Sequence, residues 1–158
     1  MKKLLLAFVC IAAFSIQSQA QSSENGNREI KVITVIESIV PMGIGRSRII
    51  DSKQEVDTEQ FTTERTEGKD SDQGKVRRKD LKIDNFEETK LLNFYSGVGI
   101  NFQNIASNDA MISSKLTSML AEGWELVHVV GGVESEAGKD DGNGIFITRF
   151  IFARTEKH

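Results

Sequence analysis

The chain has 158 residues, of which 39% are hydrophobic and 27% charged, and its formal net charge at pH 7 is −3. This length suffices for one domain with its own core, and the acidic balance argues against general binding to nucleic acid or anionic membranes. The single cysteine, Cys10, lies near the N-terminus. The rest of the chain therefore offers no disulfide and no thiolate chemistry.

The first twenty residues have the pattern of a secretory signal peptide. Two lysines precede the apolar run LLLAFVCIAAF, and the small-x-small sequence SQA ends at Ala20. The apolar run is too short for a membrane-spanning helix, which needs about 20 residues. We therefore expect residues 1–20 to be removed and the protein to be periplasmic or secreted, without a membrane span. Residues 21–28 are polar and predict a flexible tether before a single domain at 29–158.

The sequence EIKVITVIESIV, residues 29–40, predicts the first strand. β-branched residues dominate it, and apolar residues occur among both the odd-numbered and the even-numbered positions. This pattern indicates a strand covered on both faces. Pro41 ends the strand, because proline has no N–H to donate within a central ladder.

The following stretch, GIGRSR, is the best candidate for a binding site. A dinucleotide loop would need a third glycine, and a P-loop would need Gly-Lys-Ser or Gly-Lys-Thr. The glycines nevertheless free backbone amides, and Arg46, Ser47 and Arg48 add donors suited to a phosphate, sulfate or carboxylate. The alternative is a strand–turn–strand in which both arginines share a face and pair with acids such as Glu37 or Asp51.

Residues 51–88 are mostly charged and polar, and they predict a long excursion that adds little to the core. We expect a twisted hairpin through Val56 to Thr63 and a disordered tip around Gly68 to Gly74. The cluster KVRRKDLK within this segment has acids close by and no interleaved aromatic residues. It therefore indicates a solvated loop, not a nucleic-acid site.

Apolar residues return in LLNFYSGVGINFQNI, residues 91–105, which we interpret as a short strand or an irregular segment. The clearest predicted helix follows, with Ser107 or Asn108 as its N-cap and Asp109 in its first turn. Apolar residues recur at i, i+4, i+7 and i+8 from Ile112, so one stripe of the helix faces a core.

The sequence AEGWE marks the end of this helix. Gly123 stands where a residue in the left-handed conformation would terminate it. Trp124 can then fold back over Met119 or Leu120, so we assign both Gly123 and Trp124 a structural role. A tryptophan that stacks on a ligand is the alternative.

Two further strands complete the predicted sheet. Residues 124–130 alternate and place His128 on the side of Trp124 as a half-buried strand residue, and residues 144–154 form the strongest strand of the chain. The polar stretch 131–144 is predicted to connect them. Together with the first strand, these segments predict an α+β fold, with a small antiparallel sheet of three to four strands and one main helix packed on a face.

No convergent catalytic or metal-binding set is present, so we expect neither an enzyme nor a cofactor. A metal site needs several converging ligands, and the two histidines, His128 and His158, offer no His-x-His or Glu-x-x-His spacing. Asp70 and Asp72 match the first positions of a calcium loop, but Leu81 stands where its bidentate glutamate belongs. No Gly-x-Ser-x-Gly nucleophile motif occurs.

The junction MLAEGWELVHVV resembles a small bacterial domain family of unknown function, in which a helix ends in Gly-Trp-Glu-Leu and leads into a strand. The matching segments are Ala121 to Val127, the first strand, and FITRFIFAR, which ends at Arg154. The chain resembles the exported members from Gram-negative bacteria, which also carry GxGRSR and GINFxNI. The resemblance implies a helix against an antiparallel sheet and implies no known activity.

We therefore expect an exported, non-catalytic binding or structural module. A protein partner would contact the sheet edges and the segment Gly97 to Asn104. The alternative is a small-molecule binder that recognises an anionic group through Arg46, Ser47 and Arg48.

Overall fold

The computed structural model describes residues 28–39, 46–134 and 144–155. The predicted signal peptide at 1–20, almost all of the tether, both glycines of GIGRSR and His158 lie outside the described residues. Residues 29–154 belong to one compact unit.

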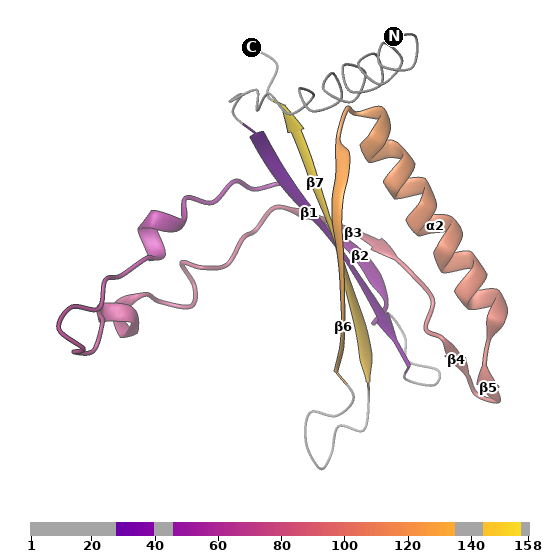
Figure 1. Ribbon diagram of the computed structural model, residues 1–158. Helices are drawn as coiled ribbons and strands as arrows, with labels where there is room; N and C mark the ends of the chain where they lie inside the picture. The colour runs from indigo at the N-terminus through magenta and orange to yellow at the C-terminus, as the bar shows by residue number, and fades with distance from the viewer. Residues whose placement is uncertain (1–27, 40–45, 135–143, 156–158) are drawn as a thin grey trace, which may run out of the picture. The chain divides into compact units, whose positions relative to one another are not determined.

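The unit contains a five-stranded antiparallel sheet, a two-stranded sheet and one main helix (Figure 1). The larger sheet has the strand order β3-β2-β1-β7-β6. Its strands are β1 (Arg28–Ser38), β2 (Arg48–Ser52), β3 (Phe86–Lys90), β6 (Glu125–Glu134) and β7 (Ile145–Thr155). The other elements are β4 (Tyr95–Ser96), β5 (Gly99–Ile100), the helix α2 (Phe102–Ala121), and the 3-10 helices η1 (Thr58–Phe61) and η2 (Asp72–Lys75).

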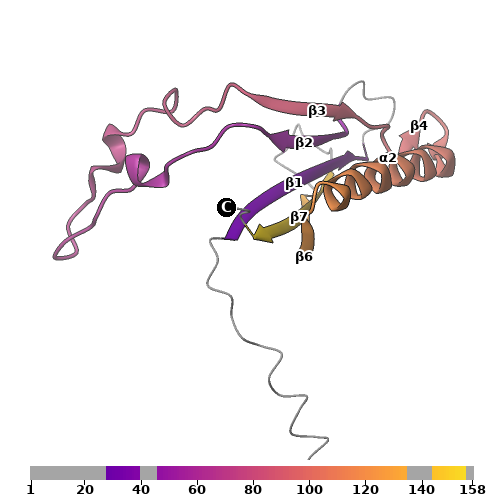
Figure 2. The ribbon, with the colours of Figure 1, turned by 90° about the horizontal axis from the view of Figure 1, so that it is seen from above.

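The predicted α+β class is confirmed, but the sheet has five strands instead of three to four. The unexpected strand is β3, with the sequence FEETK, most of which was predicted to belong to the polar excursion at 51–88. It pairs antiparallel with β2, with Ile50 opposite Glu88, and Figure 2 shows it beside β2 at one edge of the sheet. An edge strand needs a backbone ladder but no apolar side chains, so hydrophobic patterning does not reveal it.

The core lies between the sheet and α2. Its buried residues are Ile33, Val35, Ile49, Leu91, Met119, Trp124 and Phe152, with Ile112, Leu116 and Phe150 packed against them. In β1 the two faces differ sharply, since Ile33 is 1% exposed and Ile30 is 58% exposed. The prediction that both faces of this strand are covered is therefore wrong for its first half, where α2 shields only one face. Farther along the face that carries Ile30, Thr34 and Ile36 are partly buried.

The helix begins earlier than predicted. The Asn101 side chain accepts hydrogen bonds from the backbone N–H groups of Gln103 (3.1 Å) and Asn104 (3.2 Å), so Asn101 is the N-cap. Asn108 lies within α2 and is buried. The segment 91–105 accordingly contains the β4–β5 hairpin and the first turn of α2.

At its C-terminal end, α2 closes with a Schellman arrangement. Gly123 has a φ of +85°, and its N–H donates to the Leu120 carbonyl at 3.0 Å. The Trp124 N–H donates to the Met119 carbonyl at 3.1 Å, and both side chains are buried in the core. This pair of bonds satisfies carbonyls that the helix leaves unpaired.

β6 and β7 form an antiparallel hairpin in which β6 extends to Glu134. Gly131 to Glu134 therefore belong to a strand, although the sequence predicted a polar connection there. The register shifts between Leu126, opposite Phe152, and His128, opposite Ile151. Because adjacent β7 residues point to opposite faces, Leu126 and His128 do too, and His128 is exposed instead of half-buried.

Residues 53–85 leave β2 and return to β3 (Figure 1). The first and last residues of this segment are hydrogen-bonded to each other, since the Lys53 N–H donates to the Asn85 carbonyl at 3.0 Å. The predicted hairpin through Val56 to Thr63 is replaced by η1. The predicted disorder at Gly68 to Gly74 stays a prediction. None of the helices in the described residues is long and apolar enough to cross a membrane.

Candidate functional site

Ser47 is fully buried and joins three segments of the chain. Its hydroxyl donates to Oδ1 of Asn93 at 2.7 Å and accepts the Ser38 N–H at 2.9 Å. Its carbonyl accepts the Leu91 N–H at 2.9 Å. The side chain thus ties the end of β1 and the start of β2 to the segment that follows β3, and its hydroxyl faces protein groups.

The two arginines do not converge with Ser47 on one ligand position. Arg46 is exposed ahead of β2, whereas Arg48 forms an ion pair with Glu88 on β3. Asp51 was predicted as a partner, but it lies three residues along the strand and therefore on the opposite face. Ser47, Arg48, Glu88 and Lys90 line a depression of about 280 Å³. The Glu88 carboxylate in this depression competes with any anionic ligand for Arg48.

Replacing Ser47 with alanine is expected to lower the free energy of unfolding by about 1–3 kcal/mol, because buried hydrogen bonds lose their shared hydroxyl. Urea denaturation measures this loss. Arg46→Ala is the matched control and should leave the unfolding curve almost unchanged, since its side chain is exposed. A stable Ser47→Ala variant that lost phosphate- or sulfate-dependent stabilisation would instead favour an anion site.

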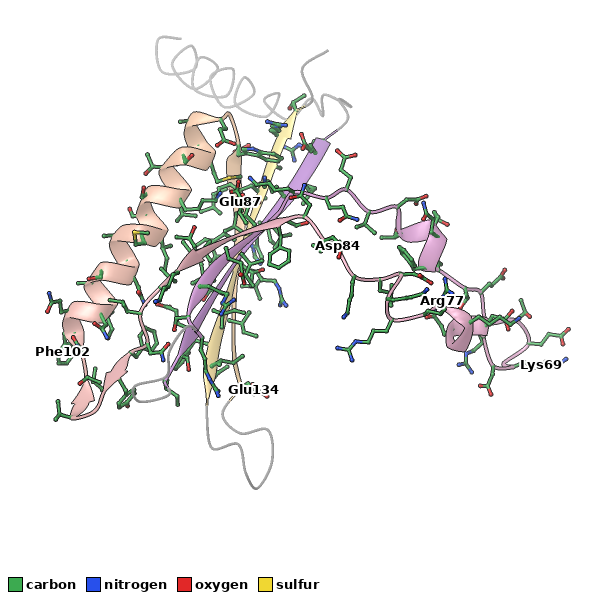
Figure 3. All side chains as sticks on the ribbon, turned by 180° about the vertical axis from the view of Figure 1, so that it is seen from behind. Lys69, Arg77, Asp84, Glu87, Phe102 and Glu134 are labelled. Atoms are coloured by element: carbon green, nitrogen blue, oxygen red, sulfur yellow. The ribbon has the colours of Figure 1, made fainter. Side chains whose placement is uncertain are left out.

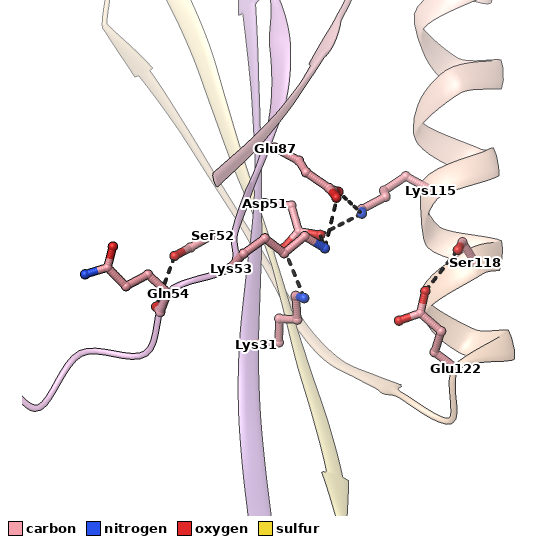
Figure 4. Close-up of polar contacts among 9 residues, drawn as sticks. All are labelled: Lys31, Asp51, Ser52, Lys53, Gln54, Glu87, Lys115, Ser118 and Glu122. Atoms are coloured by element: carbon pink, nitrogen blue, oxygen red, sulfur yellow. Dashed lines mark hydrogen bonds and ion pairs between the residues drawn. The ribbon is translucent and has the colours of Figure 1, made fainter. Parts of the chain in front are cut away.

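A second polar cluster surrounds Asp51, which is only 2% exposed (Figure 4). Lys53 and Lys115 hold its Oδ2 at 2.9 and 2.7 Å, and Lys31 Nζ lies 3.1 Å from Oδ1. Glu87 also contacts Lys53 at 3.2 Å and Lys115 at 3.9 Å. The cluster therefore links β1, β2, β3 and α2 through three ammonium groups and two carboxylates.

The lysines decide the charge state of Asp51. Burial alone would raise the pKa of its carboxyl. Hydrogen bonds from Lys115 and Lys53, together with the nearby ammonium group of Lys31, outweigh burial and lower this pKa to about 2. The hydrogen bond to Asp51 in turn raises the pKa of Lys53. Every charge of this cluster is engaged within the fold, so we interpret the cluster as a structural bridge.

The ring of Trp124 lies close to two cations. The guanidinium carbon of Arg154 is 4.2 Å from the ring centroid, and Nζ of Lys31 is 5.8 Å from it. Arg154 also pairs with Glu29 at 2.7 Å. The tryptophan is buried and in contact with these groups, which favours its structural role over stacking on a ligand.

Sequence reasoning missed the Asp51 cluster, although one signal was present. In β1, Lys31 points to the same face as the buried Ile33 and Val35, because every second residue of a strand shares a face. In β2, Asp51 points to the same face as the buried Ile49. A charged residue at a core-facing position of a strand requires a partner, because an unpaired buried charge is very costly. The partner Lys115 is 64 residues away in the sequence, so its identity could not be inferred.

The two edges of the large sheet differ in chemistry. β6 exposes all ten of its residues, including five large apolar side chains that are between 40% and 66% exposed: Leu126, Val127, Val129, Val130 and Val133. β3 has five residues, of which two are glutamates and one is lysine. A second exposed apolar group, Val98, Ile100 and Phe102, lies at the β4–β5 hairpin and the start of α2. Figure 3 labels Phe102 and, at the end of β6, Glu134.

In the described part of the chain, no group of three or more His, Cys, Asp or Glu side chains is placed to hold a metal ion. No family model, curated protein or solved structure matches the chain. The resemblance of the GWEL junction to a small bacterial family therefore stays a prediction.

Proposed function

We propose that the protein is an exported, non-catalytic binding module that accepts an extended segment of a protein partner at the free edge of β6. The observation that carries this proposal is the exposure of the whole strand, from Glu125 to Glu134. β6 is the last strand in the sheet order, so one side of its backbone has no neighbouring strand of the sheet among the described residues. Export is supported by the signal-peptide pattern at residues 1–20.

An edge strand presents N–H and C=O groups that can pair with another chain. Natural sheets usually protect such edges with lysine, proline or short strands, and β3 has the short and charged form. β6 instead has ten residues without lysine, arginine or proline. At about 3.4 Å per residue it offers a ladder of roughly 34 Å.

The polar clusters support a binding role over a catalytic one. The Ser47 hydroxyl and the Asp51 carboxylate are buried and hydrogen-bonded within the fold. The apolar side chains of β6, by contrast, face outward on both sides of the sheet edge. Strand addition uses the unpaired backbone groups of an edge together with its exposed side chains, because backbone hydrogen bonds give affinity and alternate side chains give specificity.

A random ten-residue peptide library displayed on phage and panned against the purified protein tests this proposal. We expect extended, β-branched sequences whose binding shifts the backbone amide resonances of β6. The double variant Val129→Lys, Val130→Lys places a lysine on each face of β6 and should weaken binding at least tenfold. Phe86→Lys on β3 is the control and should bind normally. Failure to recover peptides, or peptides that bind both variants equally, would overturn the proposal.

A further inference from the structure

The regular part of β6 has two glycines that the fold itself does not need. Gly131 and Gly132 have no backbone conformation that requires glycine, and a Cβ added at either position meets no atom within 4 Å. Glycine weakens a strand interior, and it often marks a site where another backbone approaches closely. The two residues lie in the stretch from His128 to Glu134, which pairs with β7 without a register shift.

Symmetry limits how this stretch can pair with a second copy of itself. Opposed residues of an antiparallel pair point to the same face, so a two-fold axis perpendicular to the sheet must place one residue opposite its own copy. His128 to Glu134 contains seven residues, and its central residue is Gly131. An axis at Gly131 therefore uses the whole regular stretch and leaves the bulge near Leu126 outside the pairing.

This register also gives compatible side-chain pairs. Val129 of each copy lies opposite Val133 of the other, so the pairing forms two valine–valine contacts and covers all four of these exposed side chains. His128 lies opposite Glu134, so an imidazole can donate a hydrogen bond to a carboxylate at each end of the pairing. The two glutamates at the ends of β6, Glu125 and Glu134, do not oppose each other. No pair of like charges is created.

The other edge of the sheet disfavours open chains of molecules. Pairing β6 of one copy with β3 of the next would place apolar residues against Glu87, Glu88 and Lys90. Such a head-to-tail contact would propagate into a fibre, whereas a two-fold contact between two β6 strands closes after two copies. The chemistry of both edges thus favours the closed arrangement.

From these observations we propose that β6 pairs with β6 of a second copy of this chain about a two-fold axis at Gly131, forming a continuous ten-stranded sheet. The proposal rests on the proposed function, because it identifies the strand that the free edge accepts. A pairing of seven residues makes a small interface, so the dimer should depend strongly on concentration.

Cysteine scanning tests both the partner and the register. Cys10 is the only cysteine of the chain and lies in the predicted signal peptide. Each residue from His128 to Glu134 can therefore be replaced singly with cysteine, with Cys10→Ser added wherever the peptide is retained. Only residue 131 would oppose its own copy, at about 5 Å between Cα atoms, within the range for a disulfide. At residues 130 and 132 the two copies would be roughly 8 Å apart, which is too far. We therefore expect maximal oxidative cross-linking at Gly131→Cys.

Sedimentation of the protein with its natural sequence supplies a second measurement. Between about 10 µM and 1 mM we expect a reversible monomer–dimer equilibrium that Val129→Lys abolishes and Phe86→Lys does not. A monomer over this whole range, a flat cross-linking profile, or a maximum away from residue 131 would overturn the proposal. If library peptides still bound to β6 in that case, the proposed strand-binding function would stand without the dimer.

Discussion

Replacing Asp51 with alanine is expected to lower the free energy of unfolding by about 3–5 kcal/mol, as is typical when one partner of a buried charge network is removed. Asp51 is 2% exposed, and the Nζ atoms of Lys53, Lys115 and Lys31 lie within 3.1 Å of its carboxylate oxygens. Without the carboxylate, three ammonium groups remain close together, with Glu87 as the other acid of the cluster. Urea denaturation with the Glu87→Gln variant as control measures the effect. Glu87 is largely exposed, so its loss should cost much less.

The acid dependence of stability gives an independent measurement on the same residue. The pKa of Asp51 is about 2 in the folded chain, against 3.8 for the unperturbed group. Its ionised form therefore adds about 2 kcal/mol of stability, which is fully present above pH 4 and is lost as the pH falls toward 2. The Asp51→Ala variant should lack this component. An equal acid slope in both proteins would contradict the ion cluster.

The alanine effect should exceed the gain indicated by the pKa. The pKa shift compares the ionised with the protonated carboxyl, and both forms fill the same space. Alanine also removes packing and hydrogen-bonding atoms, and it leaves the lysines partly desolvated. The difference between the two measurements thus separates the charge of Asp51 from its role as a bridging side chain.

The strands rich in β-branched and aromatic residues could be predicted from the sequence, and the charged strand could not. β7 and β1 have this composition, and both lie in the sheet as expected. β3 was missed because its sequence FEETK is held by backbone pairing with β2 and buries none of its side chains. The bulge near Leu126 was missed for a related reason. It is a feature of the backbone pairing between β6 and β7, and the residue types of β6 do not reveal it.

The candidate site was predicted less well than the fold, because its partners are distant in the sequence. GIGRSR indicated an anion loop or a strand–turn–strand, and the burial of Ser47 depends on Asn93, 46 residues away. Arg48 pairs with Glu88 because β3 lies beside β2, a neighbour that the sequence did not reveal. The sheet edges, by contrast, were predicted as contact surfaces, and β6 is the edge on which the proposed function now rests.

Asn108 provides the second large expected effect. Its side-chain oxygen accepts the Leu92 N–H at 2.8 Å, and its amide nitrogen donates to the Leu92 carbonyl at 2.7 Å and to Glu37 Oε1 at 3.0 Å. The amide thus pairs with the backbone of Leu92 as a neighbouring strand would. Asn108→Ala removes three hydrogen bonds at a buried position, so we expect a loss of about 3 kcal/mol in the free energy of unfolding.

The comparison with Asn101 decides between the two possible helix starts. If Asn108 were the N-cap, its replacement would cost about 1 kcal/mol and Asn101→Ala would cost little. The structure reverses this order, because Asn101 caps α2 and its loss should cost about 1 kcal/mol. Chemical denaturation of the two alanine variants side by side gives the answer, and a smaller loss for Asn108→Ala than for Asn101→Ala would contradict the structure.

Glu37 offers a measurement that reports only on Asn108. Burial raises the pKa of Glu37, the hydrogen bond from Asn108 lowers it, and the charge of Asp109 raises it, with a net upward shift. Removing the Asn108 amide takes away the hydrogen bond that stabilises the ionised form of Glu37. The pKa of Glu37 should therefore rise further in Asn108→Ala and stay unchanged in Asn101→Ala. Carbon-detected titration of the carboxyl resonances would show this directly. Because a simple loss of helix would lower the pKa of Glu37 toward its unperturbed value, the direction of the shift separates a lost hydrogen bond from a lost fold.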